Sequence, residues 1–235
     1  MANQAWLLDE LGHAGRENLD PVHVANYDEK EDAKATEEVR LLAAAGVLTD
    51  DATVIDLGAG TGQFTLAVAP RCARVVAVDV SPVMLKHLHR KVGQTPLGNV
   101  ECVHAGFLSY EHQGRAADLI YSRLALHHLP DAWKAVALCR MADMLHPGGA
   151  LRLSDVVYGF APQSAGEHFD AWMQQYPVTD PDGGWTRADV AEHIRDEHST
   201  FTWLLEPMIE RAGFQISEAH TDAAGIFAHY LCTKL

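Results

Sequence analysis

Long apolar runs are missing from this sequence. No stretch approaches the ~18 to 20 consecutive apolar residues that a membrane-spanning helix requires. Residues 1–20 also lack the basic start and the following apolar block that mark a secretory signal. We therefore expect no membrane partner and a cytoplasmic location.

Cysteine and positive charge are also scarce. The four cysteines are scattered without a C-x-x-C pair, which argues against a zinc site and a disulfide framework: Cys72, Cys102, Cys139 and Cys232. Lys and Arg number 18 against 32 Asp and Glu, so the net charge is -14 and a nucleic-acid partner is disfavoured. We expect a small-molecule substrate, and a homodimer is left open.

What the chain does contain is an apolar run that flows into alternating glycines and then into a helical pattern. Residues 54–62 read Val-Ile-Asp-Leu-Gly-Ala-Gly-Thr-Gly, and Gln63 begins the helical pattern. Glycine backbones reach conformations closed to other residues and allow a ligand to approach closely. The stretch predicts a strand, a tight ligand-binding loop and a helix.

The spacing of the glycines separates two kinds of nucleotide-like ligand. A dinucleotide loop, G-x-G-x-x-G, needs its third glycine at position 63, where this chain has Gln63. Asp79 ends a second apolar strand and follows Gly58 by about the ~20 residues that place an acid against ribose hydroxyls. The pattern therefore favours a ribose contact and weakens the pyrophosphate interpretation.

The segment from Asp56 to Gly62, followed by Asp79, resembles the first two motifs of class I S-adenosylmethionine-dependent methyltransferases. Within that class the chain is similar to the ubiquinone-biosynthesis-type group of small-molecule methyltransferases. The resemblance covers roughly residues 50 to 157. It implies S-adenosyl-L-methionine as the cofactor, with Asp79 on the ribose and Asp56 anchoring the loop or a cofactor-bound water.

The resemblance also implies the other cofactor-binding residues. Together with Asp56 and Asp79 the expected set is Tyr27, Gly58, Ala59, Gly60, Val80, Met84, Gly106, Phe107, Ser122 and Arg123. Tyr27 lies in an N-terminal segment that would fold over the cofactor as a lid. Gly106 departs from the family pattern, because related enzymes commonly place there an Asp that accepts a hydrogen bond from the adenine amino group.

The remaining patterns predict an α/β fold: a doubly wound, Rossmann-like, seven-stranded sheet, mostly parallel with an antiparallel last strand. Strands are expected near residues 54–57, 75–78, 100–105, 117–122, 150–155, 214–219 and 227–233. We expect one methyltransferase domain over residues 1–235, with an N-terminal lid and helix over 1–46. A helical cap insertion is expected over 158–201.

Methyl transfer needs aligned reactants rather than a covalent nucleophile, so a base matters only if the acceptor has a proton to lose. His127 and His128 are the candidate catalytic bases, since histidine titrates near neutrality and the pair follows the fourth strand. Adjacent side chains point in different directions, so a purely structural role stays open. No metal is expected, because no acidic cluster with coordination spacing follows that strand, and Asp155 is the one carboxylate of interest there.

Five aromatic residues of the expected cap could stack on an aromatic or heteroaromatic acceptor methylated on N, O or a nucleophilic C: Phe160, Phe169, Trp172, Tyr176 and Trp185. They could equally form the cap's own core. Two other functions remain as alternatives. A nicotinamide-dependent oxidoreductase is opposed by Gln63 and by the lack of a Tyr-x-x-x-Lys pair, and Gly106 leaves open a noncatalytic S-adenosylmethionine-binding protein.

Overall fold

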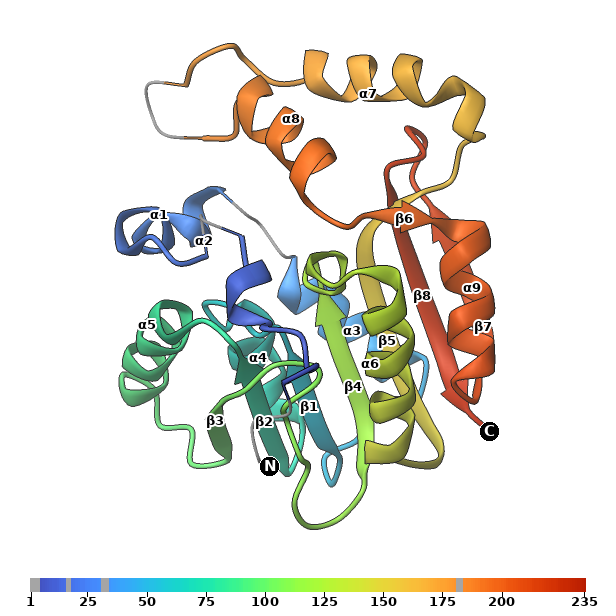
Figure 1. The fold of residues 1–235 in the computed structure, drawn as a ribbon. Coiled ribbons are helices and arrows are strands. Elements are labelled where there is room, and N and C mark those ends of the chain that lie inside the picture. The colour runs from blue at the N-terminus through green and yellow to red at the C-terminus, as the bar shows by residue number, and fades with distance from the viewer. Residues whose placement is uncertain (1–4, 16–17, 31–33, 181–183) are drawn as a thin grey trace.

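A twisted sheet organises the computed structural model, which describes residues 5–15, 18–30, 34–180 and 184–235 (Figure 1). Its strand order is β3-β2-β1-β4-β5-β8-β7. The strands are β1 Thr53–Leu57, β2 Arg74–Asp79, β3 Val100–His104, β4 Ala117–Arg123, β5 Leu145–Tyr158, β7 Phe214–Thr221 and β8 Phe227–Lys234. The first five pair in parallel, and β8 runs antiparallel between β5 and β7. The predicted fold class is confirmed.

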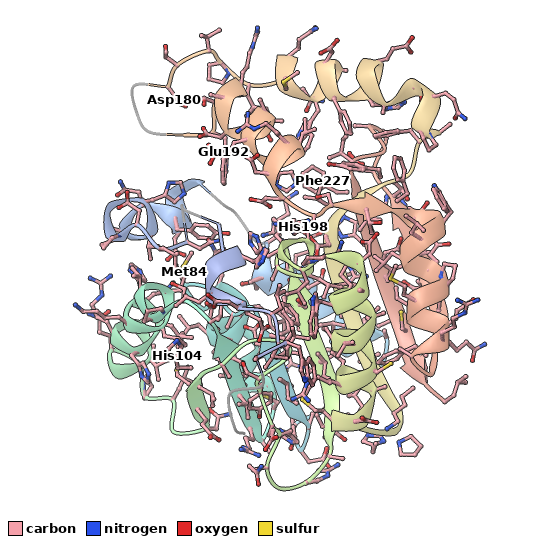
Figure 2. The ribbon with its side chains drawn as sticks, in the orientation of Figure 1. Met84, His104, Asp180, Glu192, His198 and Phe227 are labelled. Atoms are coloured by element: carbon pink, nitrogen blue, oxygen red, sulfur yellow. The ribbon has the colours of Figure 1, made fainter. Side chains whose placement is uncertain are left out.

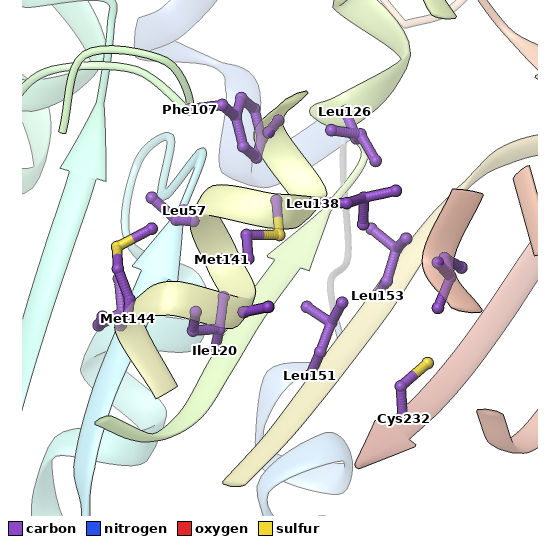
Figure 3. Packing of buried hydrophobic residues seen from close by; sticks show 14 of the residues in the cluster. Leu57, Phe107, Ile120, Leu126, Leu138, Met141, Met144, Leu151, Leu153 and Cys232 are labelled. Atoms are coloured by element: carbon purple, nitrogen blue, oxygen red, sulfur yellow. The ribbon is translucent and has the colours of Figure 1, made fainter. Parts of the chain in front are cut away.

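Helices cover both faces of the sheet, as a doubly wound fold requires. On one face α3 Ala35–Ala44 and α4 Gln63–Val68 pack with α5 Pro82–Gly93 nearby; on the other lie α6 Asp131–Met144 and α9 Thr202–Arg211. Leu138 and Met141 of α6 meet Ile120 and Leu151 from β4 and β5 (Figure 3). All five residues of β1 are buried, including the polar Thr53 and Asp56, as is typical of a central strand covered by helices on both faces.

Two differences from the predicted elements concern the centre of the sheet. The fifth strand begins at Leu145 rather than at residue 150, because Leu145 pairs with Ala117. The Pro-Gly-Gly segment, residues 147–149, lies within the strand as an irregularity, with Gly148 at φ 85°. A two-residue strand, β6 Thr200–Phe201, pairs with the end of β5 and was not predicted. So short a strand carries no sequence pattern of its own.

Two segments lie over the carboxyl ends of the parallel strands (Figure 1). We call residues 5–15 and 18–30 the lid; they form a 3-10 turn, Leu11–His13, and two short helices, α1 Pro21–Ala25 and α2 Tyr27–Lys30. We call residues 158–180 and 184–201 the cap, which contains α7 Ala165–Gln174 and α8 Arg187–Asp196. The expected lid and cap ranges also include residues 1–4, 16–17, 31–33 and 181–183, which lie outside the described residues.

The cap is fastened to α6 by partly buried polar contacts. Lys134 of α6 is 2 % exposed and donates to the carbonyl of His198 and, at 2.8 Å, to Asp131. Asp131 also accepts from the Thr200 hydroxyl at 3.2 Å.

Among the described helices, none combines the length and apolarity needed to cross a bilayer.

Candidate active site

The three loop glycines are required for two different reasons. Gly58 and Gly62 have φ of 75° and 84°, and a Cβ at these positions would lie 2.4 Å from the Ala125 Cβ and 2.1 Å from the Leu88 Cδ1. Both glycines therefore serve packing. Gly60 has φ 54° but meets nothing within 4 Å, so its absent side chain leaves open space above the loop. Gly60 is the glycine whose exposed backbone is available to a ligand.

Asp79 sits where the end of β2 meets this loop. Its Oδ2 accepts from the Gly60 amide at 2.7 Å and its Oδ1 from the Ser81 amide at 2.7 Å. Burial raises the pKa of Asp79, although the two backbone amides favour its charged form and act to lower the pKa. Each carboxylate oxygen can accept a second hydrogen bond, so the group is fixed in place and still able to bind hydroxyls.

A small cavity of about 80 Å³ opens beside the loop. Most of the expected cofactor residues line it: Tyr27, Gly58, Gly60, Asp79, Val80, Met84, Gly106, Phe107 and Arg123. Asp56, Ala59 and Ser122 of the expected set do not line it. Ser122 is fully buried within β4, and Ala59 packs toward α5 beside Leu88.

Asp56 is buried in β1 behind the glycine loop and does not line the small cavity. It accepts a 2.5 Å hydrogen bond from the Thr65 hydroxyl, so it anchors the start of α4. Burial raises the pKa of Asp56 to about 7, and the nearby charge of Asp79 also raises it. The hydrogen bond from Thr65 lowers the pKa but does not offset these two effects. Asp56 thus fits the loop-anchoring part of its expected role.

The lid is tied to the loop and to α5. Asp28 accepts from the Thr61 hydroxyl and, at 3.2 Å, from Gln63, and it pairs with Lys91 at 2.6 Å. The Ser81 hydroxyl donates to the Asn18 carbonyl at 2.6 Å. These contacts close the lid over the small cavity, whose volume is far below the ~300 Å³ at which ligand pockets begin. A cofactor-sized ligand would therefore require the lid to shift.

Glu10 of the lid supplies a carboxylate at Gly106, the position where the family pattern has Asp. A Cβ on Gly106 would lie 2.3 Å from the Glu10 Oε1, so the glycine makes room for the incoming side chain. Glu10 is 8 % exposed and accepts from the Leu108 amide and the Ser109 hydroxyl, each at 3.1 Å. The missing acid is thus replaced in space by one that lies almost a hundred residues away in sequence.

A strained turn separates the small cavity from a larger one. Leu124, directly after β4, has φ 50°, a conformation that costs a non-glycine residue about 1–3 kcal/mol. Its amide donates to the Ser154 carbonyl at 2.8 Å. Leu124, Asn18, Tyr27 and His128 line both cavities, so the two adjoin here.

The larger cavity, about 590 Å³, lies between lid and cap. Figure 2 labels three of its lining residues: Glu192 on α8, His198 in the cap just after α8, and Phe227 at the start of β8. Six histidines and five acids line it, with neither Lys nor Arg among the described lining residues: His13, His23, His127, His128, His193, His198, Asp20, Asp189, Glu192, Asp196 and Glu197. The charge of its wall is therefore negative where the histidines are neutral, and of both signs where they are protonated.

His127 is held between two carboxylates at the base of this cavity. Its Nδ1 bonds Asp155 of β5, and its Nε2 lies 2.9 Å from the Glu197 Oε2 of the cap. Burial acts to lower the pKa of His127, but Asp155 and Glu197 outweigh it and raise the pKa to about 10. In this state His127 is an imidazolium and has no free site for a proton, which differs from the expected base.

His128 is in the opposite situation. Burial and the charge of His127 lower its pKa to about 3, so it is neutral. Its Nε2 lies 3.3 Å from the Asn18 amide, while its Nδ1 is buried with no hydrogen bond to a described residue. His128 therefore contacts the lid and borders both cavities as an uncharged ring.

Comparison with known proteins supports the interpretation of this geometry. Residues 54–149 match the methyltransferase domain family model. An uncharacterized methyltransferase from Geobacillus kaustophilus is 27% identical over 170 residues, 72% of each chain. The trans-aconitate 2-methyltransferase of an Azoarcus species is 35% identical over 120 residues, 50% of this chain and 44% of that one.

The fold comparison agrees. A crystal structure of an S-adenosylmethionine-dependent methyltransferase from Clostridium acetobutylicum superposes with a TM-score of 0.68 at 14% identity, covering 91% of this chain and 97% of that one. Together these matches support a class I S-adenosylmethionine-dependent methyltransferase. Its cofactor is accordingly S-adenosylmethionine, while membership of the ubiquinone-biosynthesis-type group stays a prediction.

The cap aromatics of this methyltransferase divide into two sets. Phe160 and Phe169 pack against Tyr158, with ring centroids 5.3 and 5.1 Å from it, and belong to the cap's core. Trp172, Tyr176 and Trp185 line the larger cavity, and the first two also pack in the cap's core, where Trp172 is 5 % exposed. Trp185 meets His23 of the lid edge-on at 5.8 Å. The last contact joins cap and lid across the cavity.

The structure also adds site residues of the methyltransferase that the sequence patterns did not indicate. Glu10, Asn18, Leu124, His193 and Glu197 all line a cavity. Glu197 and His193 each stand in a charged helical pattern typical of a solvated face. One available signal was the high density of histidine and acid at the end of α8, residues 189–198.

The raised pKa of Asp56 predicts a pH dependence of stability. The folded chain retains this proton to about pH 7, whereas an unfolded Asp loses it near pH 3.9. The folded state binds more protons in this window, so Asp56 lowers the unfolding free energy as pH rises, by up to about 1.4 kcal/mol per pH unit. Asp56→Asn should remove that slope, measured as denaturant unfolding of both proteins from pH 5 to 8. Parallel curves for the two proteins would contradict the buried, protonated Asp56.

Proposed function

We propose that the protein transfers the methyl group of S-adenosylmethionine to a small neutral or cationic acceptor, aromatic or heteroaromatic, bound in the larger cavity. The observation that carries this proposal is the junction of the two cavities at Leu124 and His128. The small cavity has the glycine loop and Asp79, and the larger one has room for an acceptor. A donor and an acceptor in these places would face each other at that junction.

The reaction itself needs alignment at this junction. A lone pair on the acceptor forms a bond to the methyl carbon while the carbon–sulfur pair returns to sulfur, giving S-adenosylhomocysteine and the methylated acceptor. Holding the reacting atoms in line removes much of the entropic barrier. The strained Leu124 turn and the neutral His128 ring are the groups that would border the moving methyl group.

The cofactor roles follow from the small cavity. Asp79 would bind the ribose hydroxyls, and the backbone of Gly58 and Gly60 would pass beneath the methionine portion. Val80, Met84 and Phe107 offer apolar surface to the adenine, while Arg123 and Tyr27 close the two ends. Asp56, Ala59 and Ser122 would act from behind the loop, by holding it in shape.

Glu10 would complete the adenine site in place of the missing acid at Gly106. This supports catalysis over the noncatalytic alternative, for which the absence of that acid was the reason. The nicotinamide alternative has no comparable support. Position 63, where a dinucleotide-binding loop has its third glycine, is Gln63, and its side chain donates to Asp28 of the lid.

The charge of the larger cavity supports the acceptor class. Its described lining has acids and histidines with neither Lys nor Arg, and the chain's net charge is -14. A trianion such as trans-aconitate, the acceptor in the name of the Azoarcus relative, would meet repulsion here. The same charge disfavours a nucleic-acid acceptor. Trp172, Tyr176 and Trp185 provide faces for a flat ring.

An acceptor screen tests the proposal. We expect S-adenosylhomocysteine above the acceptor-free background with matched aromatic amines or phenols, and none with the corresponding aromatic carboxylates. Liquid chromatography with mass spectrometry quantifies the product. Turnover restricted to carboxylates would overturn the acceptor class, and no turnover with a broad metabolite pool would favour the noncatalytic alternative.

Asp79→Ala should weaken S-adenosylmethionine binding by roughly 1–3 kcal/mol, because it removes charge-assisted hydrogen bonds. Asp118→Ala is the matched control: Asp118 also accepts a backbone amide, from Thr53 at 2.8 Å, but at the amino end of β4. Calorimetry on both folded variants measures the affinities. Equal losses in the two variants would remove Asp79 from the cofactor site.

Glu10 and Gly106 should be coupled. Gly106→Asp alone places a carboxylate against Glu10 and should weaken cofactor binding about tenfold or more, and Glu10→Ala alone should weaken it by a similar factor. Combining them restores one carboxylate in the same space, so the double variant should bind within about threefold of the original chain. Additive losses would show that Glu10 serves only the lid.

A further inference from the structure

We propose that His127, His193 and Glu197 form a binding site for one divalent transition-metal ion, Zn²⁺ or Fe²⁺ by chemistry, open to the acceptor cavity. Each residue offers one ligand atom, and these atoms all lie within 4.8 Å of one another. The His127 Nε2 and the His193 Nδ1 lie 2.9 and 2.8 Å from the same oxygen, Oε2 of Glu197. The inference rests on the proposed function, because it assigns the ion to the acceptor side of that site.

The ligand set fits such an ion better than it fits Mg²⁺ or Ca²⁺. Two imidazoles and one carboxylate are the protein ligands of catalytic zinc sites and of non-haem Fe²⁺ sites, both of which keep open positions. Mg²⁺ and Ca²⁺ take oxygen ligands instead. His127, His193 and Glu197 all line the 590 Å³ cavity, so the remaining positions would face the space for the acceptor.

The outer contacts of the cluster are those of a metal site. Asp155 bonds the Nδ1 of His127 and also accepts the His127 backbone amide at 3.0 Å. It therefore orients the ring and turns Nε2 toward Glu197. The second nitrogen of His193 lies 2.9 Å from the Ser199 hydroxyl. A carboxylate or hydroxyl on the far nitrogen is the usual partner of a metal-binding histidine.

The Glu197 Oε2 is the atom on which the cluster converges. The His127 Nε2 and the His193 Nδ1 both lie within ion-pair distance of it, at 2.9 and 2.8 Å. A third nitrogen, Nδ1 of His128, lies 3.7 Å from the same oxygen and is buried without a hydrogen bond to a described residue. A cation between these atoms would satisfy the oxygen and the nitrogens together.

The place of the cluster suggests what the ion would do. It adjoins His128, which borders the cofactor cavity as well. A metal-bound oxygen, nitrogen or sulfur of the acceptor would be held at a fixed point and made easier to deprotonate. This suits an acceptor whose nucleophile is a hydroxyl, a thiol or a ring nitrogen.

Zinc binding tests the site without any cofactor or acceptor. The full-length protein is stripped with a chelator and titrated with Zn²⁺ by calorimetry, with metal content after dialysis measured by mass spectrometry. We expect one tight equivalent. Glu197→Gln and His193→Gln should each weaken that equivalent at least 100-fold, and Asp155→Asn should weaken it 10- to 100-fold.

Two control variants address the chain's 14 histidines and many acids. Glu192→Gln changes an acid of the same helix and cavity, and His168→Gln changes a cap histidine that bonds the Ala224 carbonyl. Both should bind Zn²⁺ within about twofold of the original chain. Losses as large as those of the cluster variants would overturn the assignment.

Cobalt gives a readout that needs no substitution. Co²⁺ in the site should show the visible absorption of a four- or five-coordinate ion, and Zn²⁺ should displace it. The absence of one saturable equivalent in the original chain, or an octahedral aqua-type spectrum, would overturn the proposal. S-adenosylmethionine binding and methyl transfer by the metal-free protein would leave the proposed function standing while removing the ion's role.

Discussion

The buried contact of His127 with Asp155 and Glu197 joins the parts on which the site depends. Asp155 belongs to β5 at the centre of the sheet, His127 follows β4, and Glu197 ends the cap's second helix. The His198 amide also donates to the His127 carbonyl at 3.0 Å, so the cap is held to the same residue twice. Two buried carboxylates around one imidazole require a positive charge, whether proton or metal ion. That requirement sets the distance between cap and sheet and hence the larger cavity.

The cofactor side depends on a second long-range arrangement, the lid. Asp28 ties it to Thr61 of the glycine loop, and Glu10 ties it to the turn after β3. The small cavity is therefore built from two parts of the chain, and one of them has to move for the cofactor to enter. In such a site, lid contacts influence both affinity and access.

The sequence predicted what is encoded locally. The glycine loop, Asp79 and the strand pattern each occupy a few adjacent residues with a definite spacing, and the fold followed from them. Most of the cofactor residues implied by the family resemblance line the small cavity, whereas Asp56 and Ser122 do not, because the face of a strand residue depends on the register of the whole sheet. Glu10 beside Gly106, and Glu197 beside His127, join residues separated by about 70 to 100 positions. Without the tertiary fold no spacing connects them, and Glu197 alone reads as a solvated helix end.

The central claim is that the loop at Gly58, Gly60 and Asp79 binds S-adenosylmethionine rather than a nicotinamide dinucleotide. Calorimetric titration of the unmodified protein with each ligand tests it most directly. The account predicts saturable binding of one S-adenosylmethionine per chain and no binding of NAD or NADP. Tight dinucleotide binding without binding of S-adenosylmethionine would contradict it.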